Sequence, residues 1–324
     1  MKKIAFFILP FIIFSIKAIA QDVTIDASLT ETPISAKTLS STISGSLVMP
    51  KNVKDKIPVV IIIGDAGPTD RDGNNAKTGI AGNTYKLLAI ELGKKGIATV
   101  RYDKRFVGAT TTSIKESQLH IEDYSDDAVS LINLLDNDQR FSKVVLFGHG
   151  EGALVAMLAG YDQSEKGFII AEGFADRGEK IMTDAMKDKP KFLADEFKAI
   201  MDSLKKGKTT DKVDPSLYYI ARPSIQPFVM SFCRYDPIKS LKVIKVPILI
   251  LQGTTDLTVP VINGDRFKKA KSDASYMQIK NMNHILKDAP ADPDQNTATY
   301  DKPNLPLKPE LVNGIVEFIS TKLK

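Results

Sequence analysis

Short apolar runs alternate with polar, helix-forming segments along most of the chain. Uninterrupted apolar runs are typical of strands covered on both faces, as in parallel sheets. The segments 83–96 and 122–137, and the one after Gly150, instead have the periodicity of amphipathic or buried helices. This alternation predicts an α/β fold with an open, doubly wound, mostly parallel sheet. The apolar runs are PVVIIIG (58–64), IATVRY (97–102), KVVLFG (143–148), GFIIAEG (167–173) and PILILQG (247–253).

Weaker patterns extend this arrangement at both ends. VTIDASL (23–29) and STISGSLVM (41–49) alternate apolar and polar residues, which predicts an N-terminal antiparallel hairpin at one edge of the sheet. After the last apolar run we expect a helix near 261–271, a short strand at 274–280 and a final helix from about Lys308 to Leu323. The Pro-rich stretch 289–309 is predicted to be an irregular surface loop.

One interval breaks the alternation. From about Asp176 to Lys245 there is no strong strand pattern, and KPKFLADEFKAIMDSLKKGK is helical and densely charged. We therefore predict a helical cap at 176–245, inserted into a core formed by 21–175 and 246–324. Its lysines alternate with acidic residues, which favours a solvated helix face over a binding patch.

The first twenty residues, MKKIAFFILPFIIFSIKAIA, have a basic start, an apolar stretch and small residues at the end. This pattern predicts a signal peptide at 1–20 and an exported protein, periplasmic or secreted. The alternative is an uncleaved membrane anchor, but Pro10 and Lys17 favour cleavage. Cleavage removes Lys2, Lys3 and Lys17 and lowers the formal net charge from +5 to +2. The mature chain then has no electrostatic case for a nucleic acid or membrane partner.

Cysteine and histidine are scarce. Cys233 is the single cysteine, so no intramolecular disulfide can form, and we expect it to pack in the interior. His120, His149 and His284 are far apart and have no cysteine at ligand spacing. We expect neither a metal nor a cofactor.

The stretch VVLFGHGEGALVAML (144–158) is typical of a strand that enters a helix through a tight glycine turn. Hydrolases with the pattern G-x-S-x-G carry their nucleophilic serine at the centre of this turn, where this chain has Gly150. The turn imposes a positive φ, which costs a residue with a side chain about 1–3 kcal/mol, whereas glycine adopts it with little strain. We expect the turn to form without the nucleophile.

An acid and a base follow the next strands in the order that such hydrolases use. Asp256 comes after the run 247–253, and His284 comes after the short strand at 274–280. Each could be an ordinary turn or loop residue on its own. Because they follow successive strands downstream of the glycine turn, we predict that Asp256 orients His284 and that His284 is a general base. His149 is expected to pack beside the turn.

Acyl-transfer chemistry also needs backbone N–H groups that bind a developing oxyanion. The N–H of Glu151 fits one such role, and those of Asp65 and Ala66 in GDAGPTDRDGNN (64–75) fit the other. The alternative for that segment is an ordinary surface turn rich in glycine and aspartate.

Several blocks resemble exported bacterial serine esterases of the α/β-hydrolase superfamily, often labelled serine aminopeptidase-like. The resemblance implies cofactor-free hydrolysis of small carboxylic esters, with Asp256 as acid, His284 as base and the serine at Gly150. The chain departs from the family pattern at Gly150, at Phe106, where glycine is common, and at Asp65-Ala66, where Gly-Ser is usual. The blocks are GPTDRDGN (67–74), RYDKRFVGAT (101–110), GHGEGALVA (148–156), RPSIQPF (222–228), YDP (235–237), GTTDLTVP (253–260) and NMNHILKDAP (281–290).

Three explanations of Gly150 remain open. In the first, the chain is a pseudo-hydrolase that binds a small molecule or partner. In the second, it is a slow hydrolase in which His284 and Asp256 activate a water. In the third, it is an esterase in which the glycine is an engineered or erroneous replacement. Loss of one triad member leaves roughly 10³ to 10⁴-fold catalysis over water in serine proteases. We expect a protein that is inactive or very slow toward esters. A pure scaffold is a further alternative, but it has no need of both Asp256 and His284.

Overall fold

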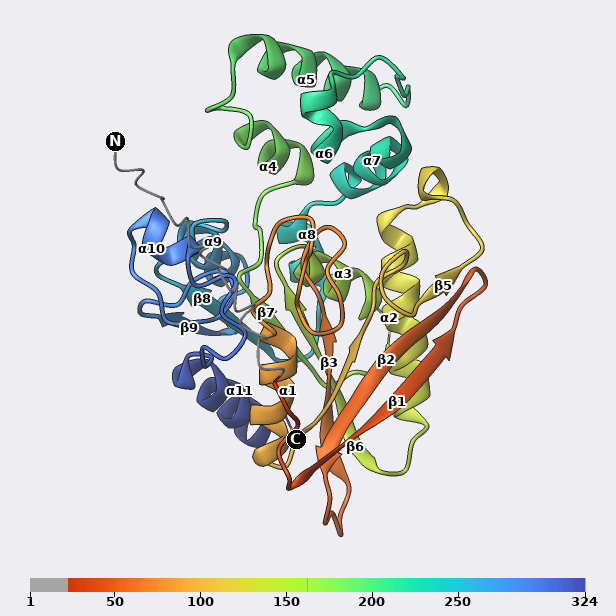
Figure 1. The fold of residues 1–324 in the computed structure, drawn as a ribbon. Coiled ribbons are helices and arrows are strands. Elements are labelled where there is room, and N and C mark those ends of the chain that lie inside the picture. Colours follow the sequence, from red (N-terminus) through yellow and green to blue (C-terminus); the bar gives the residue numbers. More distant parts are fainter. Residues whose placement is uncertain (1–22, 162, 324) are drawn as a thin grey trace, which may run out of the picture.

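The computed structural model describes residues 23–161 and 163–323 (Figure 1). The predicted signal peptide at 1–20 lies outside the described residues. One mixed sheet runs through the molecule in the order β1-β2-β4-β3-β6-β7-β8-β9, and β5 pairs with β2. Strands β4, β3, β6, β7, β8 and β9 are parallel neighbours, whereas β1 and β2 are antiparallel. The predicted α/β fold with a mostly parallel sheet and an N-terminal hairpin is confirmed.

The strands agree closely with the apolar runs. They are β1 (Leu29–Lys37), β2 (Ser41–Pro50), β3 (Ile57–Ile63), β4 (Ala98–Tyr102), β5 (Thr111–Thr112), β6 (Phe141–His149), β7 (Gly167–Ala171), β8 (Ile248–Gly253) and β9 (Ser275–Ile279).

The first strand of the hairpin differs from the prediction. It begins at Leu29 and pairs with β2 as far as Lys37, so only the last residue of the predicted strand 23–29 lies in β1. Pro33 stands inside β1, and its missing N–H is tolerated because β1 is an edge strand of the sheet. The proline and the polar sequence around it hid this strand from pattern analysis.

Helices cover both faces of the sheet. Along β3, Val60 and Ile62 pack toward α1 (Thr84–Lys94) and α11 (Pro309–Thr321). Val59 and Ile61 pack in the opposite cluster. That second face is covered by α2 (Ile121–Asp136), α3 (Glu151–Ala159), α8 (Pro237–Val243) and α9 (Ile262–Ala270). Burial on both faces explains why these strands have no polar alternation.

Residues 176–245 contain helices and short 3₁₀ turns. Figure 1 shows α4 to α7 as a layer above the sheet, beyond the ends of its central strands. Their apolar side chains form a cluster that includes Phe197, Leu217 and Val229. Leu241 of α8 instead packs in the core of the sheet layer. The elements are α4 (Gly178–Asp184), α5 (Lys191–Leu204), α6 (Tyr218–Ala221) and α7 (Gln226–Arg234), with 3₁₀ turns at Pro215–Leu217 and Pro223–Ile225 and an earlier one at Glu116–Gln118.

The predicted irregular surface loop at 289–309 is wrong in part. It contains α10 (Pro293–Thr297), and Asn296 is fully buried there. The Asn296 side-chain amide donates hydrogen bonds to the carbonyl oxygens of Thr255 and Pro290. The loop therefore braces the segment that carries Asp256.

Phe106 has a φ of 65°, a left-handed conformation that favours glycine, which agrees with the glycine that is common at this position in the family that the sequence resembles. None of the helices in the part of the chain that the structure describes is long and apolar enough to cross a bilayer.

Candidate active site

The predicted glycine turn connects β6 to α3. Gly150 has φ 55° and ψ −118°, and its N–H donates to the carbonyl oxygen of Ala171. A Cβ at Gly152 would overlap the backbone of Ile63, so this glycine lets α3 pack closely on the end of β3. The turn therefore forms as the sequence predicts, with Gly150 at its tip.

The structure brings Asp256 and His284 together. Asp256 follows β8 and His284 follows β9, and Asp256 Oδ2 lies 2.8 Å from His284 Nδ1. The second carboxylate oxygen of Asp256 accepts the N–H groups of Thr258 and Val259 at 2.6 and 2.8 Å. The acid is therefore fixed by backbone donors and points at the imidazole, as its predicted role requires.

A second acidic side chain, that of Asp65, completes the arrangement. Asp65 follows β3, and its Oδ2 lies 2.9 Å from His284 Nε2. Its Oδ1 accepts the backbone N–H of Glu151 at 2.9 Å. A Cβ built on Gly150 would overlap this Oδ1. The Asp65 carboxylate thus occupies the space into which a serine at position 150 would project.

The predicted oxyanion donors lie here in a different arrangement. The N–H of Glu151 donates to the Asp65 carboxylate, and the backbone N–H of Ala66 helps to lower the pKa of that carboxyl. The N–H of Asp65 itself faces away and donates to Tyr85 Oη at 2.8 Å. Asp65 therefore enters the site through its carboxylate and not through its backbone. Sequence analysis assigned it a backbone role because such turns approach ligands through main-chain groups.

The charge state of His284 follows from its partners. Both ring nitrogens face carboxylate oxygens, which accept hydrogen bonds when ionised, so the ring carries a proton on each nitrogen. Burial alone would lower the pKa of His284, but Asp256 and Asp65 outweigh it and raise this pKa well above its ordinary value. Burial likewise opposes ionisation of Asp65 and Asp256, but the His284 charge lowers the pKa of both carboxyls. At rest, the His284 imidazolium is thus hydrogen-bonded to two carboxylates, those of Asp65 and Asp256.

His149 contacts the backbone of His284 and helps to position it. Its Nε2 lies 2.8 Å from the carbonyl oxygen of His284, which can only accept, so Nε2 carries the proton. Its Nδ1 then accepts from Tyr85 Oη at 2.8 Å. Burial, followed by the nearby charge of His284, lowers the pKa of His149 to about 4. His149 is therefore neutral at neutral pH and connects Tyr85 to the backbone of His284.

Two other buried ionisable groups, which the sequence patterns did not predict, also contact the site. Lys104 donates from Nζ to the carbonyl oxygen of Asp65 at 2.9 Å and to Glu151 Oε1 at 3.0 Å, so it ties together the two loops that meet at Gly150. Glu172 follows β7, and burial raises its pKa well above the ordinary value, so that its neutral carboxyl hydrogen-bonds Asp256. Lys104 lies in the block RYDKRFVGAT (101–110), and Glu172 lies at the end of the apolar run GFIIAEG (167–173), but neither pattern predicts a contact with the site.

A small cavity of about 230 Å³ opens beside Asp65 and His284. Asp65, His284 and Tyr85 line it, together with Thr258 and Tyr300. Among the described residues no cluster of His, Cys, Asp and Glu side chains has the arrangement of a metal site. The Asp65 carboxylate and the His284 imidazolium are the charged groups among the residues that line the cavity.

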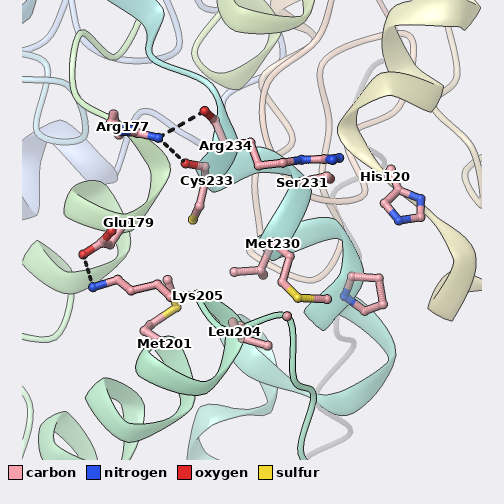
Figure 2. A pocket seen from close by; sticks show the side chains of 13 residues that line it. His120, Arg177, Glu179, Met201, Leu204, Lys205, Met230, Ser231, Cys233 and Arg234 are labelled. Carbon is pink, nitrogen blue, oxygen red and sulfur yellow. Dashed lines mark hydrogen bonds and ion pairs between the residues drawn. The ribbon is translucent and has the colours of Figure 1, made fainter.

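A larger cavity of about 480 Å³ lies in the helical layer, between α4, α5 and α7 (Figure 2). Its charged side chains are engaged: Lys205 pairs with Glu179 at 2.6 Å, and Arg177 donates to backbone carbonyls of α7. Cys233 lines this cavity, and burial raises the pKa of its thiol to about 12. These features do not form a reactive centre.

The chain has recognisable relatives in sequence. The family model described as serine aminopeptidase, S33, matches residues 79–218. Esterase EstD from Thermotoga maritima is 23% identical over 250 residues, which is 75% of this chain and 57% of that protein. The chain thus spans little more than half the length of this relative.

Solved structures with the same fold cover nearly the whole chain. Est1E from Butyrivibrio proteoclasticus, solved with ferulic acid, has a TM-score of 0.59 and 16% identity, and covers 89% of this chain and 98% of that one. A hypothetical protein from Pseudomonas aeruginosa has a TM-score of 0.62 and 13% identity, with coverage of 93% and 96%. A bromoperoxidase from Bacillus anthracis has a TM-score of 0.53 and 20% identity, with coverage of 89% and 100%. At these identities the likeness shows a shared fold.

Proposed function

Because this chain belongs to the esterase-like α/β-hydrolases, we propose that it descends from a serine ester hydrolase and is itself inactive or very slow toward carboxylic esters. One observation carries the proposal. The Asp65 carboxylate occupies the space of a serine side chain at position 150 and accepts the Glu151 N–H. The serine is thus absent, and the backbone N–H that would bind the oxyanion is already occupied by Asp65.

Acyl transfer by the serine route fails in this site for an electrostatic reason. The developing oxyanion of an ester needs backbone N–H donors, each worth about 10²- to 10³-fold in rate. Here the N–H of Glu151 already binds an anionic oxygen of Asp65. An ester carbonyl that approached this point would develop negative charge beside a carboxylate.

Activation of a water by His284 and Asp256 is opposed as well. A general base must have a free lone pair, and both nitrogens of His284 carry protons that point at carboxylates. The imidazole can accept a proton only after the Asp65 charge is removed or displaced. This supports very slow ester turnover as the upper limit for the unmodified protein.

A second candidate is a non-catalytic pseudo-hydrolase that binds a small ester-like molecule. The cavity of about 230 Å³ beside Asp65 and His284 favours this candidate, because its lining combines polar groups with isoleucine and tyrosine side chains and so suits a small ligand with polar and apolar parts. An exported location, periplasmic or secreted, remains a proposal from the N-terminal sequence, as does the absence of nucleic acid and membrane partners.

The unmodified protein provides the test. With 4-nitrophenyl acetate we expect hydrolysis at the rate given by an equal concentration of His284→Ala, and no covalent labelling by a fluorophosphonate. Both expectations follow because no free nucleophile faces the oxyanion donors. Saturable turnover within the ordinary enzymatic range, about 1 to 10³ per second, would contradict the proposal.

A further inference from the structure

We propose that the larger cavity, in the helical layer, binds a single-chain amphiphilic carboxylate such as a medium-chain fatty acid, and that the Arg177 guanidinium binds its head group. Among the described residues, none that lines this cavity also lines the small cavity beside Asp65 and His284. Binding in the helical layer goes beyond the proposed function and can be measured separately from ester turnover.

The cavity has the size and the apolar wall of a ligand site. Its volume of about 480 Å³ lies within the roughly 300–1,000 Å³ that is typical of ligand pockets. Met201, Leu204 and Val229 line it and are buried, and the partly buried Met230 lines it as well. Methionine is unbranched and flexible, so two methionines let this wall adapt to its ligand. Such a wall suits a flexible alkyl chain.

The charged side chains around the cavity differ in their partners. Lys205 pairs with Glu179 at 2.6 Å, and Arg234 pairs with Glu122 at 2.8 Å. Arg177 is exposed and also lines the cavity, but in the described part of the chain it pairs with no carboxylate. The cavity therefore has one guanidinium whose charge is not compensated, which favours an anionic head group over a neutral or cationic one.

Backbone carbonyl oxygens hold the Arg177 guanidinium in place. Its Nη2 donates to the carbonyl oxygens of Cys233 and Arg234, at 3.2 and 3.1 Å. A guanidinium has five N–H donors, so the donors on Nε and Nη1 are left for a ligand. Hydrogen bonds between a guanidinium and a carboxylate are among the strong ones. Because the side chain is already anchored, less conformational freedom is lost when the head group binds.

The polar and apolar ends of the proposed site lie on opposite sides of a thiol. Figure 2 shows the Cys233 side chain between the Arg177 guanidinium and the side chain of Met201, with Leu204 and Met230 farther from Arg177. A ligand whose carboxylate binds Arg177 and whose chain covers the methionines would therefore pass Cys233. This order of groups predicts one long, narrow ligand with a charged end.

A series of chain lengths tests the apolar wall. The purified protein is titrated calorimetrically with hexanoate, octanoate and decanoate. We expect the affinity to rise about fourfold for each added CH₂ group, because each methylene is transferred out of water. The absence of binding at millimolar decanoate, or an affinity that does not change with chain length, would overturn the proposal.

The head group is tested with Arg177→Gln. This change should weaken the binding of decanoate about tenfold or more, but leave the binding of decan-1-ol unchanged. Arg177→Lys, which keeps the charge, should lose less affinity for decanoate. Arg140→Gln is the matched control, because Arg140 is exposed and paired with Asp138. Equal losses for decanoate and decan-1-ol would mean that Arg177 only supports the helices, and would overturn its assignment to the head group.

The position of the ligand is tested with Cys233, the single cysteine of the chain. Saturating decanoate should slow the labelling of Cys233 by N-ethylmaleimide in proportion to the occupied fraction, and Asp65→Asn should bind decanoate as the unmodified protein does. Binding without protection of Cys233, or binding lost in Asp65→Asn, would place the ligand elsewhere and overturn the proposal. These results leave the proposed function standing, since turnover of 4-nitrophenyl acetate tests that separately.

Discussion

The double variant Asp65→Gly/Gly150→Ser is expected to hydrolyse 4-nitrophenyl acetate roughly 10³-fold faster than Gly150→Ser alone. The reason is that a serine cannot take its place while the Asp65 carboxylate lies against Gly150. Glycine at position 65, the residue usual in the resembling family, frees the N–H of Glu151 and the Nε2 of His284 at once.

Four proteins are compared: the unmodified protein, the two single variants and the double variant. They separate the effect of adding the nucleophile from the effect of removing the Asp65 carboxylate. Asp65→Gly alone should remain slow because it has no nucleophile, and Gly150→Ser alone should remain slow because His284 stays paired with Asp65. The kcat/KM of each and its labelling by a fluorophosphonate give the comparison. Equal gains for Gly150→Ser and the double variant would show that Asp65 does not block the site.

Replacement of His284 by alanine is expected to lower the free energy of unfolding by about 3–5 kcal/mol at pH 7, the usual cost of breaking a buried ion pair. Asp256 has a fully buried side chain, and without the imidazolium it faces Asp65 with no cation between them. Guanidinium unfolding at fixed temperature measures the loss. His120→Ala is the matched control, because that histidine is half-exposed and should change stability by no more than about 0.5 kcal/mol.

The sign of the pH dependence follows from the directions of the pKa shifts. The folded-state pKa of His284 is raised. Its contribution to the free energy of unfolding is therefore complete below about pH 6.5 and is lost as pH rises through the folded-state pKa. The folded-state pKa values of Asp65 and Asp256 are lowered, so their contributions are complete above about 3.8 and are lost as pH falls through the folded values.

The deficit of His284→Ala should therefore shrink as pH rises above 7 through the folded-state pKa of His284. The unmodified protein then loses the imidazolium that the variant lacks at every pH. A deficit that does not change over this range, or one below about 1 kcal/mol, would indicate that the carboxylates do not depend on His284.

Much of the fold could be predicted from the sequence, because its strands are buried on both faces and stand out as apolar runs. The run 58–64 agrees with β3 to within one residue at each end. Strand β1 escaped detection because its pairing with β2 is a long-range contact that its polar, proline-containing sequence does not signal. The helix α10 escaped for a similar reason, since Asn296 is buried by distant partners.

The site could be predicted only as far as local patterns specify it. The glycine turn, Asp256 and His284 each follow a strand, and the ends of parallel strands meet at one edge of the sheet. The position of the Asp65 side chain depends instead on contacts with residues 151 and 284, which no spacing rule relates to it. Its replacement of the usual glycine was visible in the sequence, but the coupling of that change to Gly150 needed the structure.

The pairing of Asp65 with His284 is the central claim, and the protonation state of His284 in the unmodified protein tests it most directly. Nitrogen-15 NMR of histidine-labelled protein, assigned with His284→Ala, distinguishes a doubly protonated ring from a neutral one across the pH range. We predict that His284 stays an imidazolium well above pH 6.5, and that Asp65→Asn lowers its pKa because one of two carboxylates is lost. A His284 ring that titrates near pH 6.5 in both proteins would contradict the account.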